Sequence, residues 1–101
     1  MKLDQDKPLH PGEFIRRTYL EPFCININQV ADKLCVNSST INRLINCKSR
    51  VVPSMALRLS IVFGRSPESW LMMQNNYDLK KEQKLIDLSQ CEPVDFDSFK
   101  N

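Results

Sequence analysis

The sequence predicts an all-α protein of five helices with a short, acidic C-terminal tail that can be extended. Three observations support this prediction. Apolar residues recur at the spacing of amphipathic helices over most of the chain. Prolines and capping residues stand where helices would begin, at Pro11, Pro53 and Ser66. Residues 26–48 form two short helical patterns joined by a tight turn, which is the arrangement of a helix-turn-helix.

The first helix is predicted to begin at Pro11, because a proline loses no hydrogen bond in the first helical turn. Glu13 lies in that turn, where its negative charge interacts favourably with the helix dipole. Pro22 lacks the N–H group that a helix interior needs. We therefore expect this helix to end near Tyr19 or Leu20.

The second helix is predicted to start after Asn26, a favoured N-cap residue, and to stop near Leu34. Asn37 can cap a third helix that runs to about Asn46. The residues expected to be buried are Val30, Ala31 and Leu34 in the second helix and Ile41, Leu44 and Ile45 in the third. Because the connection is so short, the two helices must cross steeply, and the small side chain of Ala31 lets them approach.

A fourth helix is predicted from Pro53 to Gly64, a residue type that commonly ends helices. Its apolar residues cover most of its faces, which predicts a helix at the centre of the core. These residues are Met55, Leu57, Leu59, Ile61, Val62 and Phe63.

A fifth helix is predicted to begin at Ser66, where cap, proline and acid follow in their favoured order, and to reach Leu85 or Ile86. Its apolar residues are Trp70, Leu71, Met73 and Tyr77. Trp70 and Tyr77 lie seven residues apart on one face, which indicates a core or dimer contact more than a platform for stacking bases.

The size and composition of the chain fit one domain. A chain of 101 residues has room for one modest core, and 42% hydrophobic and 26% charged residues are ordinary for a globular protein. No apolar run is long enough to cross a membrane, and residues 1–15 lack the apolar stretch of a signal peptide, so we expect a cytoplasmic protein. We expect a disordered segment over residues 1–7, a helix-turn-helix domain over 8–86 and an acidic tail over 87–101.

Charge is distributed unevenly along the chain. Residues 87–101 contain four acids and one base, a balance of −3, so the net charge of +2 leaves +5 on residues 1–86. A basic body with an acidic end fits a nucleic-acid binder, although an ordinary solvated surface is the more common cause of a charge this small. In the tail, Pro93 breaks any helix, and Val94, Phe96 and Phe99 alternate in part with acids, which permits a short extended segment.

The sequence offers little support for metal binding or catalysis. The cysteines at positions 24, 35, 47 and 91 form no CxxC pair, so we expect free thiols, no metal and no cofactor. His10 is the single histidine, and no nucleophile is evidently paired with it. Since it precedes Pro11 at a helix start, a packing or capping role is favoured over a catalytic one. We therefore expect no catalytic residue and no enzyme activity.

The third helix carries the chemistry expected of a DNA-reading helix. Ser and Thr hydroxyls can bond bases or phosphates, and an arginine can bond guanine O6 and N7 as a fork. The residues predicted to contact bases are Ser38, Ser39, Thr40, Asn42 and Arg43. The residues predicted to contact phosphates, near helix ends and in the following loop, are Asn26, Asn28, Asn46, Lys48 and Arg50. Taken singly, each could equally cap a helix or remain solvated; the combined pattern favours DNA binding.

Several motifs resemble those of the HigA antitoxins of bacterial toxin–antitoxin modules, which have a lambda-repressor-like, XRE-type helix-turn-helix. The similarity covers roughly residues 10–79, and its most specific parts are His10-Pro11-Gly12-Glu13, Ser66-Pro67-Glu68-Ser69-Trp70-Leu71 and Gln74-Asn75-Asn76-Tyr77-Asp78-Leu79. Further matching stretches are Leu20-Glu21-Pro22, Ala31 with Leu34, Ile41-Asn42-Arg43-Leu44 and Ala56-Leu57-Arg58-Leu59. The resemblance implies a five-helix homodimer that binds an operator in its own promoter. It also implies a protein partner, a HigB-like toxin of the RelE-like ribonuclease type, which the complex neutralises.

Two alternatives remain open at this point. The chain could be a stand-alone repressor without a toxin, or a protein-interaction module that lacks DNA binding. Because one recognition helix covers only a few base pairs, DNA binding normally needs a symmetric dimer with two half-sites. The fifth helix and the residues after it are the expected dimer surface, with apolar side chains at Met72, Met73, Leu85 and Ile86 and a strand or lid over 94–99.

Two positions depart from the pattern of the HigA family, which usually has glycine where this chain has Cys35 and Cys47. Both residues follow a predicted helix, where the backbone is commonly left-handed. A side chain with a Cβ costs about 1 kcal/mol there relative to glycine. We therefore expect a left-handed backbone at both cysteines and a gain in stability for Cys35→Gly.

Overall fold

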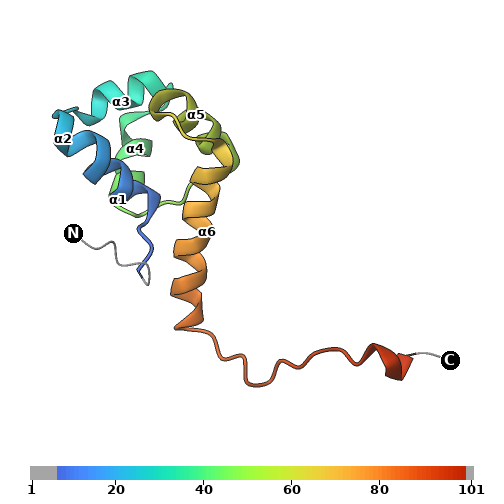
Figure 1. Ribbon diagram of the computed structural model, residues 1–101. Helices are drawn as coiled ribbons and strands as arrows, with labels where there is room; N and C mark the ends of the chain where they lie inside the picture. Colours follow the sequence, from blue (N-terminus) through green and yellow to red (C-terminus); the bar gives the residue numbers. More distant parts are fainter. Residues whose placement is uncertain (1–6, 100–101) are drawn as a thin grey trace.

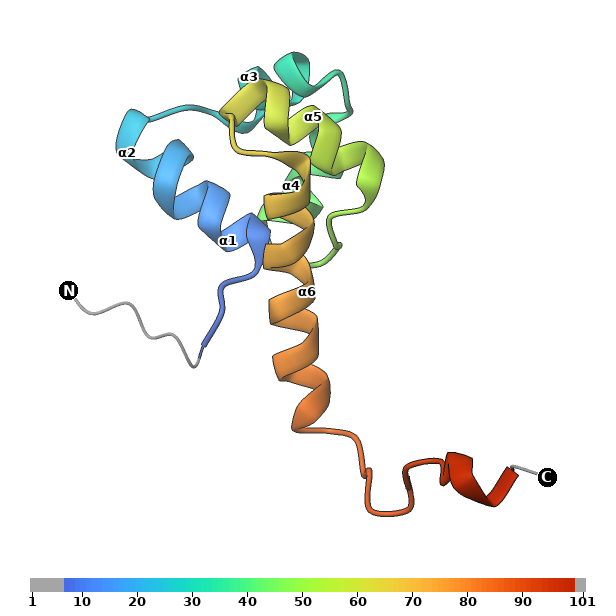
Figure 2. The same ribbon diagram turned by 45° about the vertical axis from the view of Figure 1, so that its right-hand side comes forward.

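The computed structural model describes residues 7–99, and over this range its regular elements are all helical. In chain order they are α1 (Pro11–Ile15), η1 (Arg16–Leu20), α2 (Glu21–Phe23), α3 (Ile27–Leu34), α4 (Ser38–Ile45), α5 (Pro53–Phe63), α6 (Pro67–Gln83) and η2 (Phe96–Phe99). The helices from α1 to α5 and the start of α6 form a head, and the rest of α6 leads away from it (Figures 1 and 2). The all-α fold predicted from the sequence is therefore confirmed. The disordered segment expected over 1–7 lies, apart from Lys7, outside the described residues.

The hydrophobic core lies inside the head and takes side chains from every main helix. Trp70 is fully buried in it, and its Nε1 donates to the Gly64 carbonyl at 3.1 Å. The other most buried apolar side chains are Ile15, Val30, Ala31, Leu34, Ile41, Leu44, Val51, Ala56 and Leu59. This list contains nearly all the residues whose spacing predicted inward faces for the second and third helices.

The first helical stretch is longer than the sequence indicated. It was expected to end near Tyr19 or Leu20, but it continues through α2 to Phe23. The reason is a π-helical segment, η1, in which the Glu21 N–H donates to the Arg16 carbonyl five residues earlier. The wider turn starts a new helical register at Glu21, so Pro22 falls in the first turn of α2, where its missing N–H costs nothing.

Helices α3 and α4 and the turn that joins them form the predicted helix-turn-helix. Asn26 caps α3 through a reciprocal pair of hydrogen bonds: its Oδ1 accepts from the Gln29 N–H at 2.9 Å, and Gln29 Oε1 accepts from the Asn26 N–H at 3.2 Å. Asn37 occupies the N-cap position of α4, but its side chain makes no capping hydrogen bond. Ala31 is 1% exposed beneath the turn, as expected for a residue that lets two helices approach.

One glycine is required by packing. A Cβ on Gly12 would lie 1.7 Å from the Leu44 carbonyl oxygen and 2.9 Å from the Ile45 Cα. Only a glycine in α1 allows this close approach to the C-terminal end of α4. The N-terminal helix therefore fixes the position of α4 within the head.

Helix α5 is not the central helix that its composition predicted. Met55, Ala56 and Leu59 are buried, but Leu57 is 59% exposed and Ile61 is 86% exposed. The prediction was wrong because α5 packs one face against α3 and α6, and no described element covers the other. Its apolar outer face is therefore on the surface of the head.

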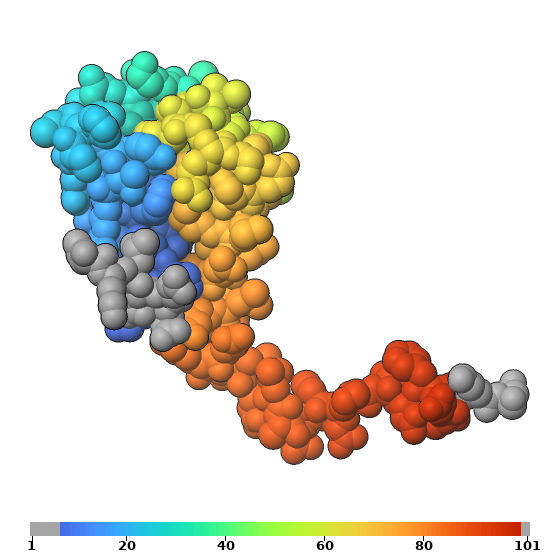
Figure 3. All heavy atoms as spheres, in the orientation of Figure 1, coloured from blue at the N-terminus to red at the C-terminus, as the bar shows by residue number. Residues whose placement is uncertain are grey.

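Helix α6 ends earlier than expected, and the tail stands away from the head. Ser66 caps α6 by accepting the Ser69 N–H at 3.1 Å, as predicted, but the helix ends at Gln83 rather than at Leu85 or Ile86. The tail segment in which the sequence permits a short extended stretch contains a short 3-10 helix, η2, at Phe96–Phe99. Every residue from 85 to 99 is exposed, and Figure 3 shows this segment clear of the head.

Candidate nucleic-acid interface

The residues predicted to contact bases share one exposed surface of α4. Ser38, Ser39, Thr40, Asn42 and Arg43 are all exposed, whereas the remaining α4 residues Ile41, Leu44 and Ile45 are buried. The 3.6-residue helical period separates these two groups. The structure thus gives α4 a polar outer face that is open to a partner.

The start of α4 is joined to the start of α3 by a direct side-chain contact. Ser38 Oγ donates to Asn28 Oδ1 at 2.6 Å. Asn26 lies beside them as the cap of α3. Two of the predicted phosphate-contacting residues therefore lie at a helix N-terminus, where backbone N–H groups and the helix dipole favour an anion.

The other predicted phosphate-contacting residues follow the end of α4. Asn46 Nδ2 donates to the Asn42 carbonyl at 2.9 Å, and Lys48 is exposed. Arg50 is bound within the protein, because its Nη2 donates to Asp78 Oδ2 at 2.7 Å while its side chain stays 59% exposed. Part of its charge is thus neutralised by α6.

A buried glutamine fixes the loop that follows α4. Gln74 is 1% exposed; its Oε1 accepts from the Val51 N–H at 2.8 Å, and its Nε2 donates to Asp78 Oδ1 at 3.0 Å. Together with the Arg50–Asp78 ion pair, these bonds hold residues 50–51 against α6. Sequence reasoning placed Gln74 and Asp78 in a family motif but assigned them no contact, although an amide one turn after the apolar Trp70 was a detectable signal of a buried polar contact.

His10, at the start of α1, supports the same loop. Its Nδ1 accepts from the Gly12 N–H at 2.9 Å, and its ring packs edge-on against Tyr77 with centroids 5.0 Å apart. Burial lowers the pKa of His10 below 6.5, while a hydrogen bond with the Ser49 backbone opposes that change. The side chain is 3% exposed, which confirms the expected packing and capping role.

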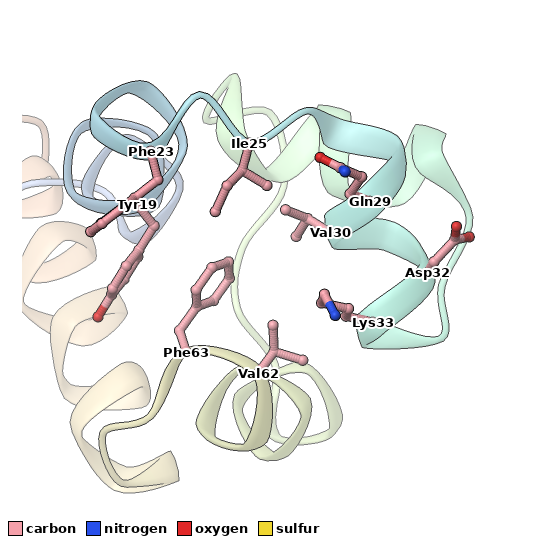
Figure 4. A pocket seen from close by; sticks show the side chains of 9 residues that line it. All are labelled: Tyr19, Phe23, Ile25, Gln29, Val30, Asp32, Lys33, Val62 and Phe63. Carbon is pink, nitrogen blue, oxygen red and sulfur yellow. The ribbon is translucent and has the colours of Figure 1, made fainter.

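A separate apolar hollow lies on another side of the head, between α2, α3 and α5 (Figure 4). It encloses about 650 Å³, and its apolar lining includes Tyr19, Phe23, Ile25, Val62 and Phe63. The charged side chains of Asp32 and Lys33 also line it. None of the residues predicted to contact DNA lines it, so it is distinct from the α4 face.

The described residues contain neither a cluster suited to a metal ion nor a membrane-spanning helix. Across residues 7–99, no group of three or more His, Cys, Asp or Glu residues is placed to hold a metal ion. Over the same range, no helix has the length and apolar character needed to cross a membrane. The four cysteines are free and exposed.

Comparison with known proteins identifies the family. No protein-family model matches the chain. The virulence-associated protein I of Dichelobacter nodosus is 38% identical over 75% of this chain and 70% of its own length. The antitoxin HigA-1 of Vibrio cholerae is 32% identical over 78% of this chain and 74% of its own length. The chain belongs to the HigA family of helix-turn-helix antitoxins and regulators.

Solved structures agree with this HigA assignment. The antitoxin GraA superposes with a TM-score of 0.81 at 32% identity, covering 87% of this chain and 98% of that one. The Pseudomonas aeruginosa antitoxin HigA, solved with the higBA promoter, superposes with a TM-score of 0.77 at 30% identity, covering 87% of this chain and 99% of that one. The fold of a DNA-binding helix-turn-helix regulator is therefore shown.

The two cysteines that replace the usual HigA-family glycines adopt the left-handed backbone expected of them. Cys35 ends α3 with φ 58°, and Cys47 follows α4 with φ 60°. Cys24 at the end of α2, which sequence reasoning did not single out, has φ 52°. The left-handed backbone expected at Cys35 and Cys47 is therefore confirmed.

Proposed function

We propose that this protein is an autoregulating antitoxin, which binds an operator in its own promoter as a homodimer and neutralises a HigB-like, RelE-like ribonuclease toxin. The observation that carries the DNA-binding part is the exposed polar face of α4, held by the Ser38–Asn28 contact and by the close packing of α1 on α4. A related HigA antitoxin was solved with its promoter, which supports the same role here. Such a protein would act in the cytoplasm, at the nucleoid.

The exposed residues of the helix-turn-helix divide into two proposed roles. Arg43 and the hydroxyl residues of α4 read base edges in the major groove, where an arginine fork on guanine contributes about 1–3 kcal/mol of discrimination. Lys48, in the loop after α4, binds a phosphate. Asn26 and Asn28, at the start of α3, bind a second phosphate position through the helix N-terminus.

The homodimer is proposed from exposed apolar residues and from the size of the reading helix. Leu79 and Leu85 are 61% and 71% exposed near the end of α6, and Met72 is 61% exposed on the same helix. A helix of eight residues, α4, reads only a few base pairs, so two half-sites are needed for selective binding. A twofold pairing through α6 would supply the second α4.

DNA binding is tested by fluorescence anisotropy of the purified protein on its own promoter fragment and on a scrambled duplex, over a series of salt concentrations. We expect promoter-selective binding that weakens steeply with salt, because phosphate contacts release counterions. Arg43→Ala should weaken binding to the promoter. Its control is Lys33→Ala, which removes a positive charge beside the apolar hollow instead of on α4. Equal binding to both duplexes by the wild-type protein would refute the operator-binding role.

The toxin partner needs its own experiment. A stand-alone repressor and an antitoxin share the α4 face, so DNA binding does not separate them. Co-expression with the neighbouring gene distinguishes the two: an antitoxin co-purifies with that product, and its loss is harmful only while the neighbour is intact. Failure of both tests with DNA binding retained would leave the stand-alone repressor as the function.

A further inference from the structure

We propose that α6 carries a second phosphate-binding surface, which contacts operator DNA outside the base pairs read by α4. This surface, the α6 lysine face, consists of Lys80, Lys81 and Lys84 with Lys7 and Tyr77 beside them. The proposal rests on the DNA-binding role proposed above and extends it to the flanks of the site.

The lysines gather on one side of α6 because of their spacing. Tyr77, Lys80, Lys81 and Lys84 stand at positions i, i+3, i+4 and i+7, which share a helix face. With Lys7 and Pro8 from the segment before α1, they line a hollow of about 290 Å³. Two separate segments of the chain therefore bring positive charge to the same place.

The α6 lysine face continues directly from the loop that follows α4. A neighbouring hollow, also of about 290 Å³, is lined by Lys48 and Ser49 of that loop together with Tyr77 and Lys81 of α6. Tyr77 and Lys81 line both hollows. One surface thus runs from the proposed phosphate contact at Lys48 down the last turns of α6.

The positive charges on this surface are not neutralised within the described chain. Over residues 7–99, the ion pairs join Arg16 with Glu21, Arg17 with Glu13 and Arg50 with Asp78, and none includes Lys80, Lys81 or Lys84. Asp78, the carboxylate that faces the neighbouring hollow, is already bonded to Arg50 and Gln74. Lys80 and Lys84 are like charges at i and i+4, an arrangement that costs stability until an anion approaches.

A nucleic acid fits this surface better than a protein does. The helix dipole alone could explain lysines in the last turn of a helix. It does not explain why Lys7 lies beside them, or why their surface continues to Lys48. Protein interfaces are depleted of lysine at their centres and anchored by buried apolar groups. Among residues 7–99, the aromatic rings that line these hollows are those of Tyr77 and His10, and they pack against each other within the protein. A row of phosphates needs no such anchor, since lysines bind them as point charges.

The test compares wild type with the double variant Lys80→Gln/Lys84→Gln on two promoter duplexes. The shorter is the smallest promoter duplex that retains selective binding, and the longer adds about one helical turn, ~10 base pairs, at each end. On the longer duplex, we expect the variant to flatten the plot of log affinity against log salt by about 3.6, because a dimer loses four phosphate contacts and each contributes about 0.9. On the shorter duplex, we expect the slopes of variant and wild type to agree.

The controls separate this inference from the function on which it rests. Lys33→Gln, at the apolar hollow, should leave both slopes unchanged, and thermal melting should show that the double variant is folded. Wild type without promoter selectivity would refute operator binding itself. Selective wild type with an unchanged slope for the double variant would overturn the α6 contact alone. If the double variant flattens the salt slope equally on both duplexes, the lysines contact base pairs within the shorter duplex, and the flanking contact is overturned. If the double variant has an altered oligomeric state and unchanged slopes, the lysines bind the acidic tail of a second copy. That result would also overturn the proposed DNA contact.

Discussion

Replacing Cys35 by glycine should stabilise this protein, because the residue ends α3 in a backbone conformation that suits glycine. Its φ and ψ are 58° and 45°, and a left-handed residue with a Cβ costs about 1–2 kcal/mol. Glycine gives back about 0.4–1 kcal/mol through the greater freedom of the unfolded chain. The side chain is exposed, so no packing is lost. The expected net gain in the free energy of unfolding is about 1 kcal/mol.

The structure also explains why the Cys35→Gly substitution should leave the turn intact. The Cys35 N–H donates to the Asp32 carbonyl at 3.2 Å, and the Val36 N–H donates to the Ala31 carbonyl at 3.1 Å. Both are backbone contacts that glycine retains, and Arg58 Nη1 still donates to the Leu34 carbonyl at 2.7 Å.

The assay for Cys35→Gly is thermal unfolding under reducing conditions, where 1 kcal/mol corresponds to a rise of about 4–8 °C in Tm for a domain of this size. Cys35→Ala is the matched control, since it removes the thiol but keeps the Cβ, and we expect no comparable rise. An unchanged or lower Tm for the glycine variant would refute the reasoning. So would an equal rise for the alanine variant, which would attribute the gain to loss of the thiol.

Three further predictions concern the interface and the groups that support it. Gln74→Leu should lower the free energy of unfolding by about 1–3 kcal/mol in urea titrations, because it leaves the buried Val51 N–H without an acceptor; no loss would contradict the role of this bond. Stability should fall as pH drops below 6.5, because the unfolded chain then protonates His10 more readily than the folded one, and His10→Asn, which can still cap α1, should flatten this dependence. Arg43→Ala should relax base preference at one operator position and cost about 1–3 kcal/mol of binding free energy. Lys48→Ala should instead weaken binding to all sequences and flatten the salt slope. Identical behaviour of the two variants in anisotropy titrations would refute the division of roles.

The features predicted correctly from the sequence were those decided by neighbouring residues. Asn26 and Ser66 cap helices through hydrogen bonds to the N–H three residues on, so a local pattern was sufficient. The exposed and buried sides of α4 followed from helical spacing alone. The left-handed conformations of Cys35 and Cys47 were anticipated because the HigA family usually has glycine there.

The features that were missed depend on residues far apart in the chain. Gln74 bonds Val51 across 23 positions, and Arg50 bonds Asp78 across 28, so no short pattern could show that α6 holds the loop after α4. Pro22 was assigned to a helix end because the interior of an ordinary α-helix does not accommodate proline. A π turn, which local propensity does not predict, puts Pro22 in the first turn of α2, where no N–H is needed. The apolar residues of α5 indicated burial, whereas the packing of the head leaves Leu57 and Ile61 uncovered.

These long-range bonds connect the proposed dimer surface to the proposed DNA-reading surface. Gln74 and Asp78 hold the loop after α4, while Leu79 and Leu85, on and just beyond the same helix, are exposed for a partner copy. In a dimer paired through α6, the distance and angle between the two copies of α4 would therefore be set through this helix. It follows that Gln74→Leu should weaken selectivity for half-site spacing more than it weakens binding to one half-site. Operators lengthened by one base pair between the half-sites test this in anisotropy titrations. Equal discrimination by wild type and variant would show that α6 does not transmit the geometry of the dimer to α4.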